Sequence, residues 1–141
     1  MNLKDRMILD EYRKQRQSFV ELGDLASSLL KQQLAARGID TLAVEHRVKK
    51  EDSLIGKLER KSDKYRSLGD LTDILGIRVI CFFGDDVDRV GRMIEELFAV
   101  DWENSVDKRA LIKANSFGYL SLHYVCTLPA GQEYPTELYS R

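Results

Sequence analysis

Charged and aromatic side chains stand where the surrounding residues otherwise read as buried strands and helices. Arg47 and Lys49 are two residues apart in one such stretch, and Arg78 interrupts an apolar run that Asp73 directly precedes. The segment 118–123 (Gly-Tyr-Leu-Ser-Leu-His) places an aromatic ring beside a glycine. Clustered cations suit phosphates, a carboxylate at the mouth of a strand suits Mg²⁺, and a ring beside a glycine suits a flat ligand. These residue types indicate a site for two polyphosphates, a metal ion and a purine ring.

A strand and a helix are predicted to carry the first group of cations. In the strand predicted over 43–49, alternation places Arg47 and Lys49 on one face. The helix predicted from Asp52, its cap, to about Tyr65 has a polar face opposite its apolar stripe. That face consists of Ser53, Lys57, Arg60 and Lys64. Its first member lies in the first turn, where free backbone N–H groups favour anions. The strand pattern is also explained by an edge strand with a charged outer face. The helix pattern is also explained by an ordinary solvated face.

The segment 74–83 is the strongest strand prediction in the chain. It is rich in β-branched and aromatic residues and apolar on both faces, which predicts a central strand covered on both sides. Arg78 within it needs a carboxylate, a phosphate or a ring as its partner. A buried ion pair with Asp73 would also satisfy it. Asp73 itself could be a turn or cap residue, although Asp70 suits that role better.

The strand predicted over 119–128 has two different faces. Apolar side chains form one face, while Tyr119 and His123 lie on the other. Tyr119 has room to stack on a flat ligand, and His123 could bond a phosphate or a base edge. A lone histidine in a sheet is more often a structural residue, and for His46 this is the only interpretation.

The remaining elements complete the fold prediction. A helix is predicted over 3–36, a second one after the turn at 84–86, and a strand over 99–106, followed by a polar loop over 107–117. This order predicts an α+β fold with a mixed β-sheet flanked by helices. The 141 residues are enough for one domain with a real core.

Composition restricts the class of protein. The net charge of -1 gives no global attraction to nucleic acid or an anionic membrane, and no apolar run is long enough to span a bilayer. The stretch 47–78 holds nine Lys or Arg against six Asp or Glu, a modest local charge of +3. Cys81 and Cys126 lie in apolar runs, which predicts buried free thiols in a reducing cytoplasm. No Walker A or GxGxxG phosphate loop is present.

Four motifs, in this order, resemble the synthetase domain of RelA/SpoT-type alarmone synthetases, which are GTP pyrophosphokinases with a nucleotidyltransferase-like fold. The motifs are Arg47-Val48-Lys49, Ser53 with Lys57, Asp70-Leu-Thr-Asp73-Ile-Leu-Gly-Ile-Arg78, and Gly118-Tyr119-Leu-Ser-Leu-His123. The resemblance runs from about Val44 to Leu128. The chain resembles the small, stand-alone synthetases of this family. It implies one synthetase domain over 1–141, with an N-terminal helical segment at 1–40 and a catalytic core at 41–141.

The resemblance implies transfer of the β,γ-pyrophosphoryl group of ATP to the 3′-hydroxyl of GTP or GDP, giving AMP and (p)ppGpp, with Mg²⁺. ATP would be bound by Arg47, Lys49, Ser53, Lys57, Arg60 and Arg78. Of these, Arg47 and Arg78 would flank the adenine. Asp73 would bind Mg²⁺, Tyr119 would stack on the guanine, and His123 and Lys113 would contact the acceptor's phosphates. A cytoplasmic enzyme without a DNA or membrane partner is implied, in a homo-oligomer such as a tetramer.

One departure from the family concerns the end of the chain. Members carry a further strand with a Glu-x-Gln-x-Arg-Thr signature, whose glutamate is a second acidic residue at the metal, implicated in activating the 3′-hydroxyl. The chain ends at Arg141, about where that strand should begin, and the surroundings of Glu133 and Glu137 do not match the signature. We therefore expect a C-terminally incomplete core, an unpaired sheet edge and weak or no activity of this piece.

Two other classes of function stay open at this point. One is a catalytically inactive, nucleotide-binding regulatory module, which would bind nucleotide without releasing AMP. The other is a protein whose basic helix face binds RNA or another partner, which would show a steep salt dependence.

Overall fold

The computed structural model describes residues 1–107, 121–127 and 134–141. No helix in these ranges is long and apolar enough to cross a membrane. The described elements are α1 (Leu3–Ala36), β1 (Thr41–Val48), α2 (Glu51–Arg60), the short 3₁₀ helices η1 (Ser62–Lys64) and η2 (Leu68–Asp70), β2 (Leu75–Cys81), α3 (Gly84–Leu97), β3 (Ala99–Asp107), β4 (Leu122–Thr127) and β5 (Thr136–Ser140).

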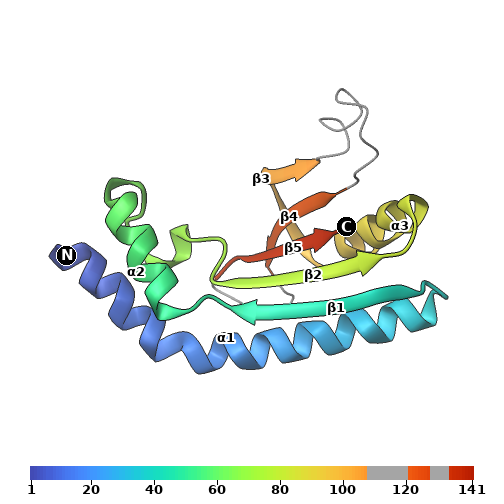
Figure 1. The fold of residues 1–141 in the computed structure, drawn as a ribbon, viewed down its shortest axis with the longest axis horizontal. Helices are drawn as coiled ribbons and strands as arrows, with labels where there is room; N and C mark the ends of the chain where they lie inside the picture. The colour runs from blue at the N-terminus through green and yellow to red at the C-terminus, as the bar shows by residue number, and fades with distance from the viewer. Residues whose placement is uncertain (108–120, 128–133) are drawn as a thin grey trace.

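The five strands form one mixed sheet in the order β1-β2-β5-β4-β3 (Figure 1). Strands β2 and β5 are parallel, and the other neighbouring pairs are antiparallel. Two antiparallel pairs, β1–β2 and β3–β4, are therefore joined through β5. The α+β prediction with a mixed sheet and helices is confirmed.

Helices α1 and α3 pack on the same face of this sheet. Gly23 of α1 lies against Leu75 of β2, and Gly91 of α3 lies against Tyr124 of β4. The register pairs Ile77 with Leu138 and Leu138 with Tyr124, so side chains of alternate residues on the three inner strands share this face. In Figure 1, α1 runs alongside β1, and α3 lies at the far end of β2. The core lies between these helices and the sheet.

The opposite face of β2 is open, which corrects the prediction of a strand covered on both sides. Leu75, Ile77 and Val79 are buried, whereas Arg78 is exposed and Gly76 is half-buried. The strand is central in its pairing, as its apolar character indicated, but the arginine on its second face stays in contact with solvent.

Strand β5 corrects the expectation of a missing strand and an unpaired edge. It forms the middle of the sheet, and its inward residues Thr136, Leu138 and Ser140 are buried. The smaller differences are at element ends. Helix α2 ends at Arg60 rather than near Tyr65, and its N-cap is Lys50 without a side-chain hydrogen bond, not Asp52. The predicted loop 107–117 lies almost entirely outside the described residues.

The two thiols differ in burial. Cys126 is buried as predicted, and burial raises its pKa to about 12. Cys81 is only half-buried, and burial raises its pKa as well. Both cysteines are free.

The close approach of α3 to β4 gives a test of the packing. A Cβ atom on Gly91 would lie 2.5 Å from Leu122 Cδ1 and 2.7 Å from Tyr124 Oη. We expect Gly91→Ala to lower the free energy of unfolding by about 1–3 kcal/mol, because the helix or the buried Leu122 and Tyr124 side chains must shift to make room. Urea denaturation followed by circular dichroism measures this.

Gly56→Ala in α2 is the matched control. Its Cβ would meet only the mobile end of Arg60, at 3.1 Å. The helix preference for alanine should leave that variant as stable as the parent or more stable by up to about 1 kcal/mol. Equal stability of Gly91→Ala and the parent would contradict the described packing.

Candidate active site

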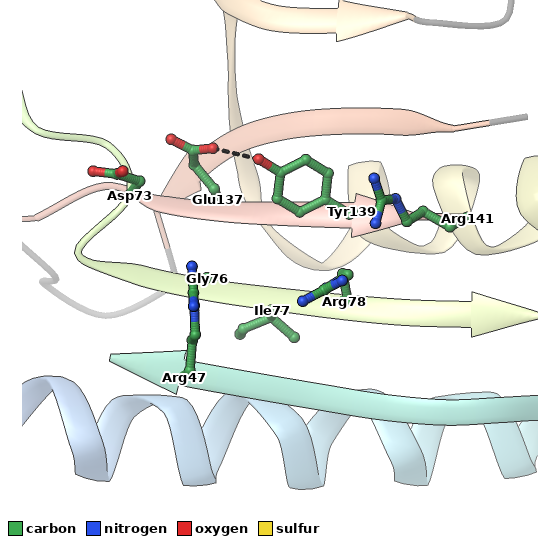
Figure 2. Close-up of a pocket in the computed structure, with 8 residues that line it drawn as sticks. All are labelled: Arg47, Asp73, Gly76, Ile77, Arg78, Glu137, Tyr139 and Arg141. Atoms are coloured by element: carbon green, nitrogen blue, oxygen red, sulfur yellow. Dashed lines mark hydrogen bonds between the residues drawn. The ribbon is translucent and has the colours of Figure 1, made fainter. Parts of the chain in front are cut away.

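A pocket of about 310 Å³ opens on the uncovered face of the sheet (Figure 2). Side chains from β1, the turn before β2, β2 itself and the β5 region line it. They are Arg47, Asp73, Gly76, Ile77, Arg78, Glu137, Tyr139 and Arg141. Three arginines and two carboxylates thus meet in one concave site, although they are spread over nearly one hundred residues of sequence.

Strand register explains why these side chains converge. Gly76 pairs with Arg47 of β1 on one side and with Glu137 of β5 on the other. Arg78, two residues further along β2, pairs with Tyr139. Because side chains at i and i+2 share a face, both rows lie on the open side. A Cβ on Gly76 would meet no atom within 4 Å, so the glycine leaves the floor between Arg47 and Glu137 free.

Asp73 carries the main ion pairs of the site. The Nζ atoms of Lys49 and Lys57 both lie 2.9 Å from its Oδ2. Its Oδ1 is buried, and no described residue forms a hydrogen bond with it. Burial opposes ionisation of this carboxyl, but the hydrogen bonds from the two lysines outweigh burial and lower its pKa. One oxygen of an ionised carboxylate is therefore neutralised, and the other has no protein partner in the described structure.

The backbone around Lys49 is fixed from two sides. Its N–H donates to the carbonyl of Ile74 at 2.7 Å, and its carbonyl accepts from the hydroxyl of Tyr12 at 2.6 Å. Tyr12 belongs to α1 and is 1% exposed. Lys57 is placed by α2, whose Leu54 and Leu58 are buried in the core. Helix α1 and helix α2 thus set the positions of the two lysines.

Glu137 is held by three donors. Its Oε1 accepts from the hydroxyl of Tyr139 at 2.7 Å and lies 2.9 Å from His123 Nε2, and its Oε2 accepts from Thr72 at 2.6 Å. Burial again opposes ionisation, but the hydrogen bonds from His123, Thr72 and Tyr139 outweigh it and lower the pKa of Glu137 to about 2. An ionised carboxylate only accepts hydrogen bonds, so His123 Nε2 is the donor.

The structure brings together five of the predicted site residues. Arg47, Asp73 and Arg78 line the pocket, and Lys49 and Lys57 contact Asp73. The alternative of a buried Arg78–Asp73 ion pair is wrong, because Arg78 is exposed and the two lysines pair with the aspartate.

The other predicted residues have different outcomes. His123 lies beside the pocket as the partner of Glu137. Ser53 and Arg60 are exposed on α2 and do not line the pocket. Tyr119 and Lys113 lie outside the described residues. The roles proposed for all of these side chains stay predictions.

Sequence reasoning missed the β5 side of the site, namely Glu137, Tyr139 and Arg141. The spacing Glu137-x-Tyr139-x-Arg141 fits the Glu-x-Gln-x-Arg signature with tyrosine in place of glutamine. This spacing could have identified the strand from the sequence, but the tyrosine at the glutamine position made the match to the signature hard to recognise. Strand β5 is also short, with Pro135 directly before it, so its own residues predict a strand only weakly.

The acidic side chains could hold a divalent metal ion. Asp73 and Glu137 line the same pocket, and Asp73 Oδ1 is buried without a hydrogen bond from the described residues. Those residues contain no group of three or more His, Cys, Asp or Glu side chains that could hold a metal. Mg²⁺ commonly takes one or two carboxylates and completes its octahedron with water and substrate phosphates, whereas zinc and calcium sites use more protein ligands.

Comparison with known proteins agrees with this geometry. The family model described as "Region found in RelA / SpoT proteins" matches residues 46–139, and the chain belongs to this family. It is 37% identical over 87 residues to GTP pyrophosphokinase YjbM of Bacillus subtilis (strain 168), a match that covers 61% of this chain and 40% of that protein. The matched segment thus spans less than half of that relative's length.

The fold is similar to that of small alarmone synthetase 1 from Bacillus subtilis. The TM-score is 0.72 at 24% identity, over 92% of this chain and 70% of that one. The same synthetase bound to its product pppGpp gives a TM-score of 0.72 at 25% identity, over 92% of this chain and 71% of that one.

The low pKa of Glu137 predicts acid sensitivity. The pKa of Glu137 is about 2 in the folded chain, below its ordinary value of 4.5. At pH values between these two, the unfolded chain binds more protons than the folded chain. Ionised Glu137 stabilises the fold at pH values above its ordinary pKa. This stabilisation is lost as the pH falls toward the pKa of Glu137 in the folded chain. We expect the free energy of unfolding, measured in urea without divalent cations, to fall steadily from about pH 5 to about pH 2.

Two variants separate Glu137 from the other carboxyl groups. Glu137→Gln should lower stability at pH 7 and flatten the pH dependence. Glu95→Gln, at an exposed position on α3, should keep the parent's slope. If Glu137→Gln kept the full slope, the three hydrogen bonds would not be stabilising the ionised form.

Proposed function

We propose that this chain transfers the β,γ-pyrophosphoryl group of ATP to the 3′-hydroxyl of GTP or GDP, giving AMP and pppGpp or ppGpp. In this reaction the 3′-oxygen bonds to the β-phosphorus and loses its proton, while the bond from that phosphorus to the α–β bridging oxygen breaks. The observation that carries the proposal is the convergence of Asp73 and Glu137 with Arg47 and Arg78 in one pocket. Family membership and the pppGpp-bound relative support it.

Lys49 and Lys57 are proposed to bind the ATP phosphates. Both ammonium groups are now on one oxygen of Asp73, which neutralises a single carboxylate with two cations. A polyphosphate offers them several oxygens and more negative charge, so they can turn from Asp73 to the nucleotide. Ser53 and Arg60, exposed on the same helix as Lys57, would contact the outer phosphates.

Arg47 and Arg78 are proposed to hold the adenine between them. They lie on adjacent strands, two register positions apart, and both guanidinium groups line the pocket. A planar guanidinium can stack on a purine ring, which a lysine ammonium cannot. This use explains an arginine on a central strand for which the described residues supply no anionic partner.

Asp73 and Glu137 would hold a divalent cation, which we propose to be Mg²⁺. When bound, such an ion neutralises charge on the phosphates that react. For the acceptor nucleotide, we propose that Tyr119 stacks on the guanine and that His123 and Lys113 contact the phosphates. Of these three, His123 is within the described structure, where Glu137 holds its Nε2.

The physical reason for expecting inactivity no longer holds. That expectation depended on a missing glutamate strand, whereas Glu137 stands on β5 in the middle of the sheet. We therefore propose that the chain is catalytically competent. A cytoplasmic location, suggested by two free thiols, and a homo-oligomer such as a tetramer remain part of the proposal. Neither DNA nor membrane is proposed as a partner.

The proposal is tested by incubating the protein with ATP, GDP and Mg²⁺ and measuring AMP and the guanosine product by ion-exchange chromatography. Asp73→Asn should reduce turnover about a hundredfold or more, because it removes charge at the centre of the site. Asp40→Asn, an exposed change before β1, should keep parent turnover.

Other outcomes point to other functions. Nucleotide binding by calorimetry without any AMP would favour the inactive regulatory module. Binding of RNA that falls steeply with salt, with no nucleotide preference, would favour the RNA-binding alternative. Unchanged turnover in Asp73→Asn would refute the metal assignment.

A further inference from the structure

Tyr139 stands where the family signature has glutamine, and it contacts three other groups of the site. Its hydroxyl donates to Glu137 Oε1 at 2.7 Å. Its ring stacks on the His123 ring with centroids 4.7 Å apart and planes 20° apart. The Arg141 guanidinium carbon lies 5.6 Å from the centre of the same ring. A glutamine could supply a hydrogen bond at this position but could offer no ring.

The hydroxyl and Glu137 form a charge-assisted hydrogen bond, which is stronger than one between neutral groups. The two residues are i and i+2 on β5, so they share the open face, and Figure 2 shows the tyrosine reaching back along the strand to the carboxylate. The hydroxyl of a tyrosine can donate, and an ionised carboxylate only accepts, so the phenol is the donor in this pair.

The ring connects two strands. Tyr139 and His123 are directly paired in the antiparallel β5–β4 register, which places their rings side by side. His123 Nε2 in turn donates to the oxygen of Glu137 that receives the tyrosine hydroxyl. The three side chains therefore form a closed set, in which each one restrains the other two.

We propose that Tyr139 is a positioning residue, whose hydroxyl fixes the Glu137 carboxylate and whose ring fixes the His123 imidazole. The two groups then meet bound nucleotides in one arrangement. This inference rests on the proposed function for its catalytic consequence, but the arrangement itself can be tested without activity.

The structural test uses NMR signals of the two histidines of the chain, His46 and His123. A stacked aromatic ring shields the protons of its neighbour, so the His123 ring protons should be shifted upfield in the parent and in Tyr139→Phe. Tyr139→Gln should lose that shift. His46, which bonds Asp24 of α1, is the internal control and should not change. An unshifted His123 in the parent, or one that stays shifted in Tyr139→Gln, would overturn the proposal.

The kinetic test separates the hydroxyl from the ring. Tyr139→Phe keeps the stack and removes the bond to Glu137, so kcat for AMP release should fall about ten- to a hundredfold with little change in KM. Tyr139→Gln, which restores a donor, should recover part of the kcat lost in the phenylalanine variant. Tyr134→Phe, which removes a hydroxyl that bonds Glu11 of α1 instead, should behave like the parent.

The outcomes distinguish this inference from the function. If the parent releases no AMP, the proposed function fails, and the NMR shifts still decide whether Tyr139 fixes His123. If the parent is active and Tyr139→Phe keeps its full kcat, the positioning role of the hydroxyl is refuted while the function stands.

Discussion

The contact between Asp73 and the ammonium groups of Lys49 and Lys57 organises the site. It joins the end of β1, helix α2 and the start of β2, three segments that the chain visits in turn. The two ammonium groups share one half-buried carboxylate, which leaves one positive charge in excess, and an uncompensated ion in this environment is costly. In the proposed reaction, a polyphosphate would take up this excess positive charge, and a divalent cation would replace the lysines at Asp73. Two lysines on one carboxylate are therefore consistent with the nucleotide site that we propose.

The one-sided packing of the sheet is the second constraint. With α1 and α3 on one face, the other face can direct Arg47, Arg78, Glu137 and Tyr139 into the pocket from three adjacent strands. A second helical layer over these strands would bury the arginines without partners. The openness of this face and the polar residues on it therefore depend on each other.

Sequence reasoning predicted the elements that carry strong local signals. The β-branched run around Arg78 gave β2, and the polar residues at helical spacing gave α2 with Lys57 facing the site. Whether β2 was covered on both faces could not be inferred, because its apolar residues on the open side, such as Ile80, look like core residues in one dimension. Glu137 was missed for a different reason. Its strand is five residues long and gains its stability from pairing with β2 and β4, which no local pattern reveals. Lys113 and Tyr119 lie outside the described residues.

The central place of β5 has a consequence for biosynthesis. The β1–β2 and β3–β4 pairs can each form while the nascent chain is still emerging, but they meet only through a segment translated near residue 140. Pairings so distant along the chain are slow to form, since the intervening loop must first be closed. Asp73 and Glu137 therefore cannot line one pocket until the ribosome has released that segment. A half-made polypeptide, with its arginines already exposed, would lack the second carboxylate.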